Sequence, residues 1–111
     1  MPYDQNLTER IRVVLKNYPG CVEKKMFGGV GFILRGNLAV GVQGNDLIVR
    51  VGPEYNGTAL SQPHVRPFMP VRGRPMAGWV LVAPAGIPDG EILQHWVELG
   101  YNYAASLPEK A

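Results

Sequence analysis

The chain has 111 residues, 46% of them apolar and 18% charged, and a formal net charge of +2. This composition is typical of one globular domain and excludes a long disordered chain, and no apolar run approaches the roughly 20 residues of a membrane-spanning helix. The first residues lack the basic and apolar segments of a signal peptide, so we expect a single cytoplasmic domain over residues 1–111, without membrane contact.

The first predicted element is an amphipathic helix close to the N-terminus. Asp4 or Asn6 can cap it, because either side chain can accept a hydrogen bond from a free backbone N–H group of the first turn. Its apolar positions recur at helical spacing: Leu7, Ile11, Val14, Leu15 and Tyr18. The step from Pro19 to Gly20 predicts the end of the helix.

Four runs with strand character follow, at residues 22–27, 30–35, 38–43 and 46–51. The connections between them are short and contain the turn residues Gly28, Gly29, Gly36 and Asn37, which tolerate the positive φ of tight hairpins. No helix-length segment separates these runs. The pattern therefore predicts an antiparallel meander.

The second half of the chain predicts two more helices and one more strand. A short helix over residues 53–61 is followed by a proline-rich loop over 62–78, a strand over 79–83 and a final helix capped by Asp89. The resulting layout is α-β-β-β-β-α-β-α. We expect a two-layer α+β fold, in which N-terminal and C-terminal helices pack on an antiparallel sheet of about five strands.

Cys21 is the only cysteine, which excludes an internal disulfide and a zinc site built from cysteines. With His64 or His95 it could form a nucleophile and base, but a catalytic thiol needs a neighbouring cation or a helix N-terminus to lower its pKa. At the entrance to a strand, a lone cysteine is more often a small buried side chain. Two histidines without a carboxylate cluster do not make a metal site, so we expect neither metal nor cofactor.

A glycine pair follows two lysines, Lys24 and Lys25, at the first turn of the meander. Such glycines could cradle a phosphate, but a phosphate loop needs a helix directly after the strand, and here a second strand follows. The pattern favours a tight hairpin. The two lysines would then point to opposite faces of the sheet, with at least one of them in solvent.

The middle of the chain is basic, because residues 55–88 contain no acid and three arginines, Arg66, Arg72 and Arg74. Arg72 and Arg74 could grip a phosphate or carboxylate, and Phe68 and Trp79 could stack on a base. Alternatively, Trp79 begins a buried strand and the arginines brace the long loop.

Arg50 lies within a predicted strand, between two valines. If this side of the sheet is covered, the guanidinium needs a counter-ion. We expect an acid of the final helix to supply it.

Three blocks of sequence occur in a characteristic order: KKMFGG at 24–29, LIVRVG at 47–52 and RPMAGWV at 74–80. Together they resemble the N-terminal domain of TfoX/Sxy-type proteins, a family named after a regulator of natural competence. The resemblance implies a compact α+β fold and carries no catalytic motif. Full-length regulators of this family have a further C-terminal helical domain and act on transcription with the cyclic-AMP receptor protein, whereas we expect a stand-alone domain here.

The resemblance, together with the lack of a convincing reaction centre, leads us to expect a non-enzymatic regulatory or protein-interaction domain. Its candidate contact residues are Lys24, Lys25, Arg50, Arg72, Arg74 and Trp79. We expect its partner to be another protein, and a homodimer is a further possibility because an open sheet leaves an edge strand. Two alternatives stay open: nucleic-acid binding through the basic loop with Arg66, Arg72 and Arg74, and a small enzyme that uses Cys21.

Overall fold

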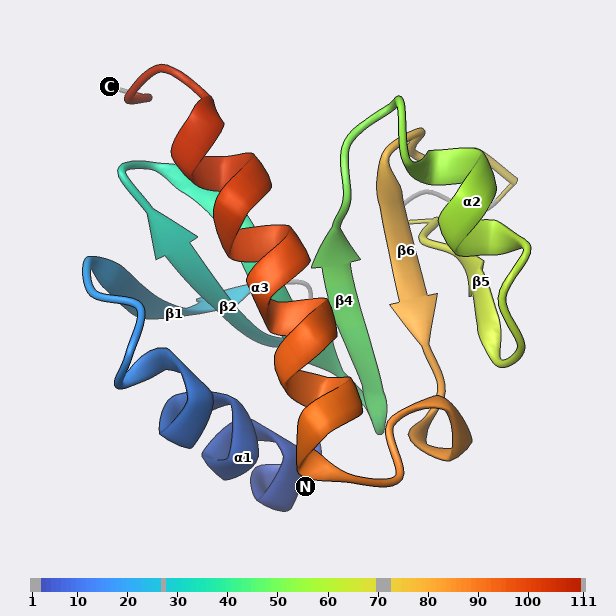
Figure 1. Ribbon diagram of the computed structural model, residues 1–111, viewed down its shortest axis with the longest axis horizontal. Helices are drawn as coiled ribbons and strands as arrows, with labels where there is room; N and C mark the ends of the chain where they lie inside the picture. The colour runs from blue at the N-terminus through green and yellow to red at the C-terminus, as the bar shows by residue number, and fades with distance from the viewer. Residues whose placement is uncertain (1–2, 27, 70–72, 111) are drawn as a thin grey trace.

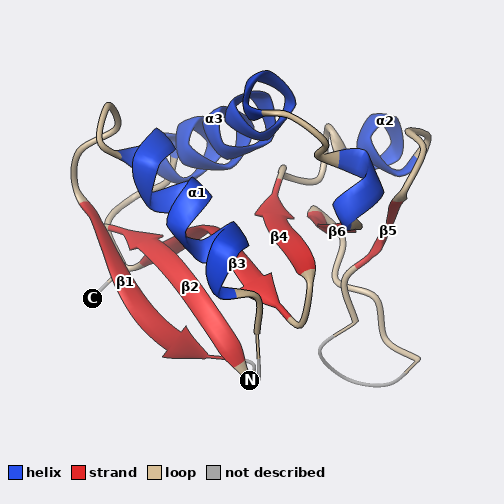
Figure 2. Ribbon diagram, turned by 90° about the horizontal axis from the view of Figure 1, so that it is seen from below, coloured by secondary structure: helices blue, strands red, loops and turns tan. Residues whose placement is uncertain are grey.

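A computed structural model of the chain describes residues 3–26, 28–69 and 73–110. The order of elements is α1 (Gln5–Leu15), β1 (Cys21–Met26), β2 (Gly29–Leu34), β3 (Asn37–Gln43), β4 (Asp46–Arg50), α2 (Asn56–Leu60), β5 (Val65–Pro67), β6 (Trp79–Val82), the 3-10 turn η1 (Pro84–Gly86) and α3 (Gly90–Ser106). The helices lie on one face of a six-stranded antiparallel sheet, with α3 crossing its centre (Figures 1 and 2). The expected two-layer α+β fold is confirmed.

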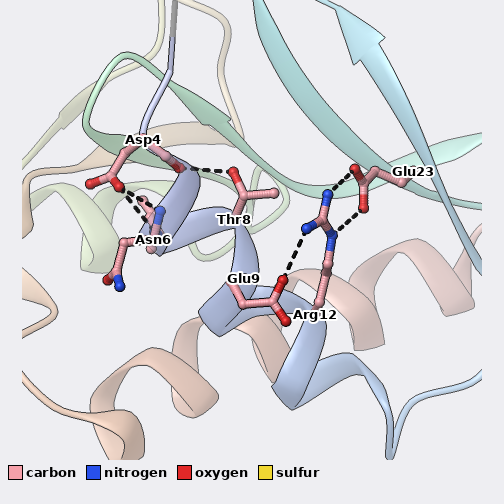
Figure 3. Close-up of polar contacts among 7 residues, drawn as sticks. Asp4, Asn6, Thr8, Glu9, Arg12 and Glu23 are labelled. Carbon is pink, nitrogen blue, oxygen red and sulfur yellow. Dashed lines mark hydrogen bonds and ion pairs between the residues drawn. The ribbon is translucent and has the colours of Figure 1, made fainter. Parts of the chain in front are cut away.

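Helix α1 begins at a side-chain cap. The carboxylate of Asp4 accepts hydrogen bonds from the backbone N–H groups of Asn6 and Leu7 at 2.9 and 3.1 Å, and the Thr8 hydroxyl donates to the Asp4 carbonyl oxygen (Figure 3). Of the two predicted capping residues, Asp4 is therefore the one that caps α1. Leu7 and Ile11 are buried on the face of α1 that turns toward the sheet.

The first four strands form the predicted meander. Each turn of the meander is flanked by the last pair of residues of two paired strands. These pairs are Met26 with Gly29, Leu34 with Asn37, and Gln43 with Asp46. Gly28 and Gly36 have φ values of +72° and +83°, which suits glycine because it has no Cβ. Gly29 and Asn37 are the first residues of β2 and β3, and Phe27 lies outside the described residues.

The sheet contains one strand more than expected, because β5 lies within the segment predicted as a loop. The strand order is β1-β2-β3-β4-β6-β5, so β6 returns beside β4 and β5 forms the far edge. Strand β5 has only three residues, ends in Pro67 and pairs on one side alone. So short a run has no alternating pattern, and a proline argues against a central strand, which explains why the sequence did not reveal it.

Each face of the sheet carries its own apolar cluster. The larger one lies under the helices and includes Ile11, Val40, Val49, Trp96 and Val97. The smaller one lies on the opposite face and contains Leu38, Ile48, Phe68 and Leu81. The described residues between β5 and β6 lie on this second side of the sheet (Figure 2).

Helix α3 is the main cover of the sheet. Asp89 caps it as predicted, accepting a hydrogen bond from the backbone N–H of Ile92 at 3.0 Å. Gly100 lets the helix approach closely, since an added Cβ would lie 2.3 Å from the carbonyl oxygen of Ala39. Among the described residues, no helix has both the length and the apolar character to cross a membrane.

Candidate interaction site

Two of the three sequence blocks meet where β4 ends and β6 begins. Arg50, the last residue of β4, lies opposite Trp79, the first residue of β6. The backbone N–H groups of Val51 and Gly52 both donate to the carbonyl oxygen of Gly78, at 2.8 and 3.1 Å. Blocks 47–52 and 74–80 therefore join at one end of the sheet.

Gly52 and Gly78 make this junction sterically possible. Their φ values are +88° and +87°, a region that L side chains rarely adopt. A Cβ on Gly78 would lie 2.9 Å from the carbonyl carbon of Gly52, and one on Gly52 would lie 2.5 Å from the Tyr103 ring. The side chain of Asn56 completes the junction by accepting a hydrogen bond from the Gly78 N–H at 2.9 Å.

The guanidinium of Arg50 lies beside two aromatic rings. Its central carbon is 5.1 Å from the centroid of the Trp79 ring and 5.6 Å from that of Tyr103 in α3. Both distances are within the range of a cation–π interaction, which stabilises by about 0.5–2 kcal/mol depending on exposure.

The expected ion pair of Arg50 with an acid of the final helix is wrong. Among the described residues, Arg50 forms no ion pair, and the group that α3 brings to it is the Tyr103 ring. Glu98 of α3 instead accepts a hydrogen bond from the Tyr18 hydroxyl. Arg50 is half-buried, so its positive charge lies at the surface, and no carboxylate of residues 3–26, 28–69 or 73–110 forms an ion pair with it.

The ring of Trp79 also packs against a buried aromatic side chain. It stacks on the ring of Phe68, with centroids 5.8 Å apart and planes inclined by 22°. Phe68 is fully buried, whereas Trp79 is partly exposed. Arg50, Phe68, Trp79 and Tyr103 therefore form a continuous stack, named here the Arg50 cluster, whose outer members reach solvent while its base is fixed in the core.

A cavity of about 600 Å³ borders the Arg50 cluster on the helix side. Tyr103 belongs to both, and Tyr55, Glu54 and Ser106 form further parts of the cavity wall. The cavity meets the Arg50 cluster at Tyr103, and its wall combines two tyrosine rings with a few polar groups. Such a lining is typical of a contact site for a side chain of another molecule.

The structure does not gather the other predicted contact residues around this cluster. Lys24 and Lys25 are exposed on β1, four strand spacings from β6, or roughly 19 Å away. Arg66 forms an ion pair with Asp46 of β4. Arg74 is exposed, and Arg72 lies outside the described residues.

Cys21 is not brought together with either histidine. It lines a cavity of about 230 Å³ with Tyr18 and Glu23, whereas His64 and His95 line a different cavity of about 510 Å³. Partial burial raises the pKa of the Cys21 thiol, which lowers the fraction of reactive thiolate at neutral pH. Within the described part of the chain, no set of three or more His, Cys, Asp or Glu residues is placed to hold a metal ion.

Tyr103 is the member of the site that sequence reasoning missed. Helical spacing predicts one apolar face of the final helix, which includes Tyr101 and Ala104 and does not include Tyr103. Gly52 and Gly78 were quoted within the sequence blocks, but without a structural role. A glycine that ends a strand and another that precedes one were the available signal for a close backbone approach.

Comparison with known protein families confirms the resemblance suggested by the three blocks. Residues 14–104, which are most of the chain, match the TfoX N-terminal domain. No curated protein sequence matches the chain. The matched range includes every residue of the Arg50 cluster.

Proposed function

Because the chain belongs to the TfoX N-terminal domain family, we propose that it is a regulatory domain that acts by binding another protein. The family supports a regulatory role and supplies no catalytic motif. The separation of Cys21 from both histidines, and the raised pKa of its thiol, favour binding over catalysis.

The observation that carries this proposal is the Arg50 cluster. Arg and Trp are the residue types most often found as hot spots of protein interfaces, where they contribute most of the binding energy. Trp79 is fixed by Phe68, so little conformational entropy is lost when a partner contacts it. Arg50 keeps N–H groups for a carboxylate that the described residues do not provide.

The basic loop supports nucleic-acid binding less well. Arg66 already has an acidic partner in Asp46. The lysines of β1 lie at the opposite edge of the sheet from β5, which carries Arg66. Dedicated nucleic-acid binders present a denser basic stripe. We therefore favour a protein partner that presents an acidic or C-terminal carboxylate to Arg50 next to an apolar side chain for Trp79.

Affinity capture from a native lysate tests this function. The immobilised chain is compared with its Arg50→Gln variant, and each lysate is used with and without nuclease digestion. Lys16→Gln is the matched control, because it removes one positive charge from the exposed residue that directly follows α1. Circular dichroism and thermal melting show that the variants are folded.

We expect capture of a protein that persists after nuclease digestion and that Lys16→Gln retains. Arg50→Gln should bind this protein about thirtyfold less tightly, because the loss of a hot spot costs about 2 kcal/mol or more. Loss of all captured material after digestion would favour the nucleic-acid alternative. Equal capture by Arg50→Gln and the unmodified chain would show that the Arg50 cluster is not the contact.

A further inference from the structure

A second surface suited to binding is the outer edge of β1, which is the edge of the sheet farthest from β5. Strand β1 has six residues, and its four central residues, from Val22 to Lys25, are all exposed. The other edge strand, β5, has three residues and ends in Pro67, which cannot donate a backbone hydrogen bond. Of the two edges, β1 is therefore the one suited to pairing with a further strand.

The side chains of β1 alternate between the two faces of the sheet. Glu23 and Lys25 lie opposite Phe32 and Val30, which belong to the core under the helices. Glu23 also binds Arg12 of α1, at 2.7 and 2.8 Å, which fixes it on the helix side (Figure 3).

The alternate residues of β1 face away from the helices. These are Val22, Lys24 and Met26, opposite Ile33, Gly31 and Gly29. Val22 is 65% exposed, a large fraction for an apolar side chain within a strand. Met26 lies across Gly31, since a Cβ added there would be 2.3 Å from the Met26 sulfur. The edge therefore presents two apolar side chains on either side of Lys24 on one face, and the opposite charges of Glu23 and Lys25 on the other.

We propose that two copies of this chain associate through β1, in antiparallel register about Lys24, to form one continuous sheet with all helices on the same side. In this register Glu23 lies opposite Lys25 of the second copy, and Lys25 opposite its Glu23. Val22 likewise lies opposite Met26 of the second copy, and Met26 lies opposite its Val22. Directly opposed residues of antiparallel strands lie about 4.5–5.5 Å apart, so these are contacting pairs.

Neighbouring registers that keep the helices on the same side are poorly matched. Centring the strands on Glu23 places two Glu23 carboxylates opposite each other and Val22 opposite Lys24. Centring them on Lys25 places two Lys25 ammonium groups together and Met26 opposite Lys24. Only the register about Lys24 gives two unlike charge pairs and two apolar pairs.

This register has one unfavourable contact, because Lys24 meets Lys24 of the second copy at the twofold axis. Like charges directly opposite each other destabilise a strand pair. Lysine on an edge strand commonly serves to discourage association, and Lys24 would limit the dimer in this way. The proposal therefore predicts that a substitution that removes the Lys24 charge strengthens the dimer.

Sedimentation equilibrium over a range of protein concentrations measures the dimer dissociation constant. We expect Lys24→Thr to lower this constant and Lys25→Glu to raise it about tenfold, since each substitution acts twice in a symmetric dimer. Arg74→Glu is the control, because it reverses one exposed charge at a distance from β1 and should leave the constant unchanged.

A chain that stays monomeric at millimolar concentration, with Lys24→Thr monomeric too, would overturn the proposal. Weaker association of Lys24→Thr would contradict the register about Lys24. Neither result concerns the Arg50 cluster, which lies on β4, β6 and α3, so the dimer and the proposed function can fail separately.

Discussion

At the scale of single residues, the clearest role of a charged group is to hold two elements together. Arg12 of α1 holds Glu23 of β1 through two hydrogen bonds and also binds Glu9 (Figure 3). The guanidinium lowers the pKa of the Glu23 carboxyl, and the two acids raise the pKa of Arg12. This arrangement ties the first helix to the edge strand.

The Arg12–Glu23 contact predicts a pH dependence of stability. A carboxyl with a lowered folded-state pKa contributes stability above its unfolded pKa, about 4.3 for glutamate, and loses it as the pH falls through the folded pKa. The free energy of unfolding of the unmodified chain should therefore exceed that of Glu23→Gln at pH 7. The difference should shrink as the pH falls below about 4.

Urea unfolding of both proteins at pH 7, 5 and 3 measures this difference. All other titrating groups are common to the two proteins, so their contributions cancel to a first approximation. A difference that stays constant down to pH 3 would show that the Glu23 carboxylate does not contribute through its charge.

At the scale of elements, the junction of β4 and β6 depends on two glycines. Gly78 has a φ of +87°, and its backbone is in contact with that of Gly52. This junction fixes the relative position of Arg50 and Trp79, because each residue is next to or near one of the glycines. The geometry of the Arg50 cluster is therefore a property of the backbone as much as of its side chains.

Gly78→Ala should lower the free energy of unfolding by about 2 kcal/mol or more, because alanine at positive φ is strained and its Cβ would contact the Gly52 backbone. Gly57→Ala in α2 is the matched control. It meets no atom within 4 Å and should be neutral or stabilise by up to about 1 kcal/mol. Urea unfolding measures both, and equal effects would contradict the role given to Gly78.

Most elements could be predicted from the sequence, but the contacts between distant ones could not. Helical spacing identified α1, the Asp89 cap identified the start of α3, and glycine turns identified the meander, because these signals are local. Strand β5 was missed because three residues ending in Pro67 carry no periodic pattern.

The candidate site was predictable only in pieces. Arg50 and Trp79 were each singled out, but their contact depends on β6 lying beside β4, which local patterns do not specify. Tyr103 comes from a third element and joins them only once α3 is packed on the sheet. The sequence accordingly suggested a carboxylate partner for Arg50 where the structure has two rings.

At the scale of the whole molecule, the two proposed contact surfaces lie apart. The Arg50 cluster is at the junction of β4 and β6, and the β1 edge is separated from β4 by β2 and β3. A partner on one surface therefore leaves the other open. A dimer formed through β1 would present two Arg50 clusters, which would allow it to bind a partner with two sites more tightly than a monomer does.

The most direct test of the binding account uses the two tryptophans of the chain. Their indole N–H groups give separate signals in a nitrogen-15 correlation spectrum, and Trp96 of α3 is only 3% exposed because it packs in the core between the helix and the sheet. When the protein recovered by nuclease-treated capture is titrated in, we expect the Trp79 signal to shift or broaden while the Trp96 signal stays in place. Binding that leaves the Trp79 signal unchanged would contradict the claim that the Arg50 cluster is the contact surface.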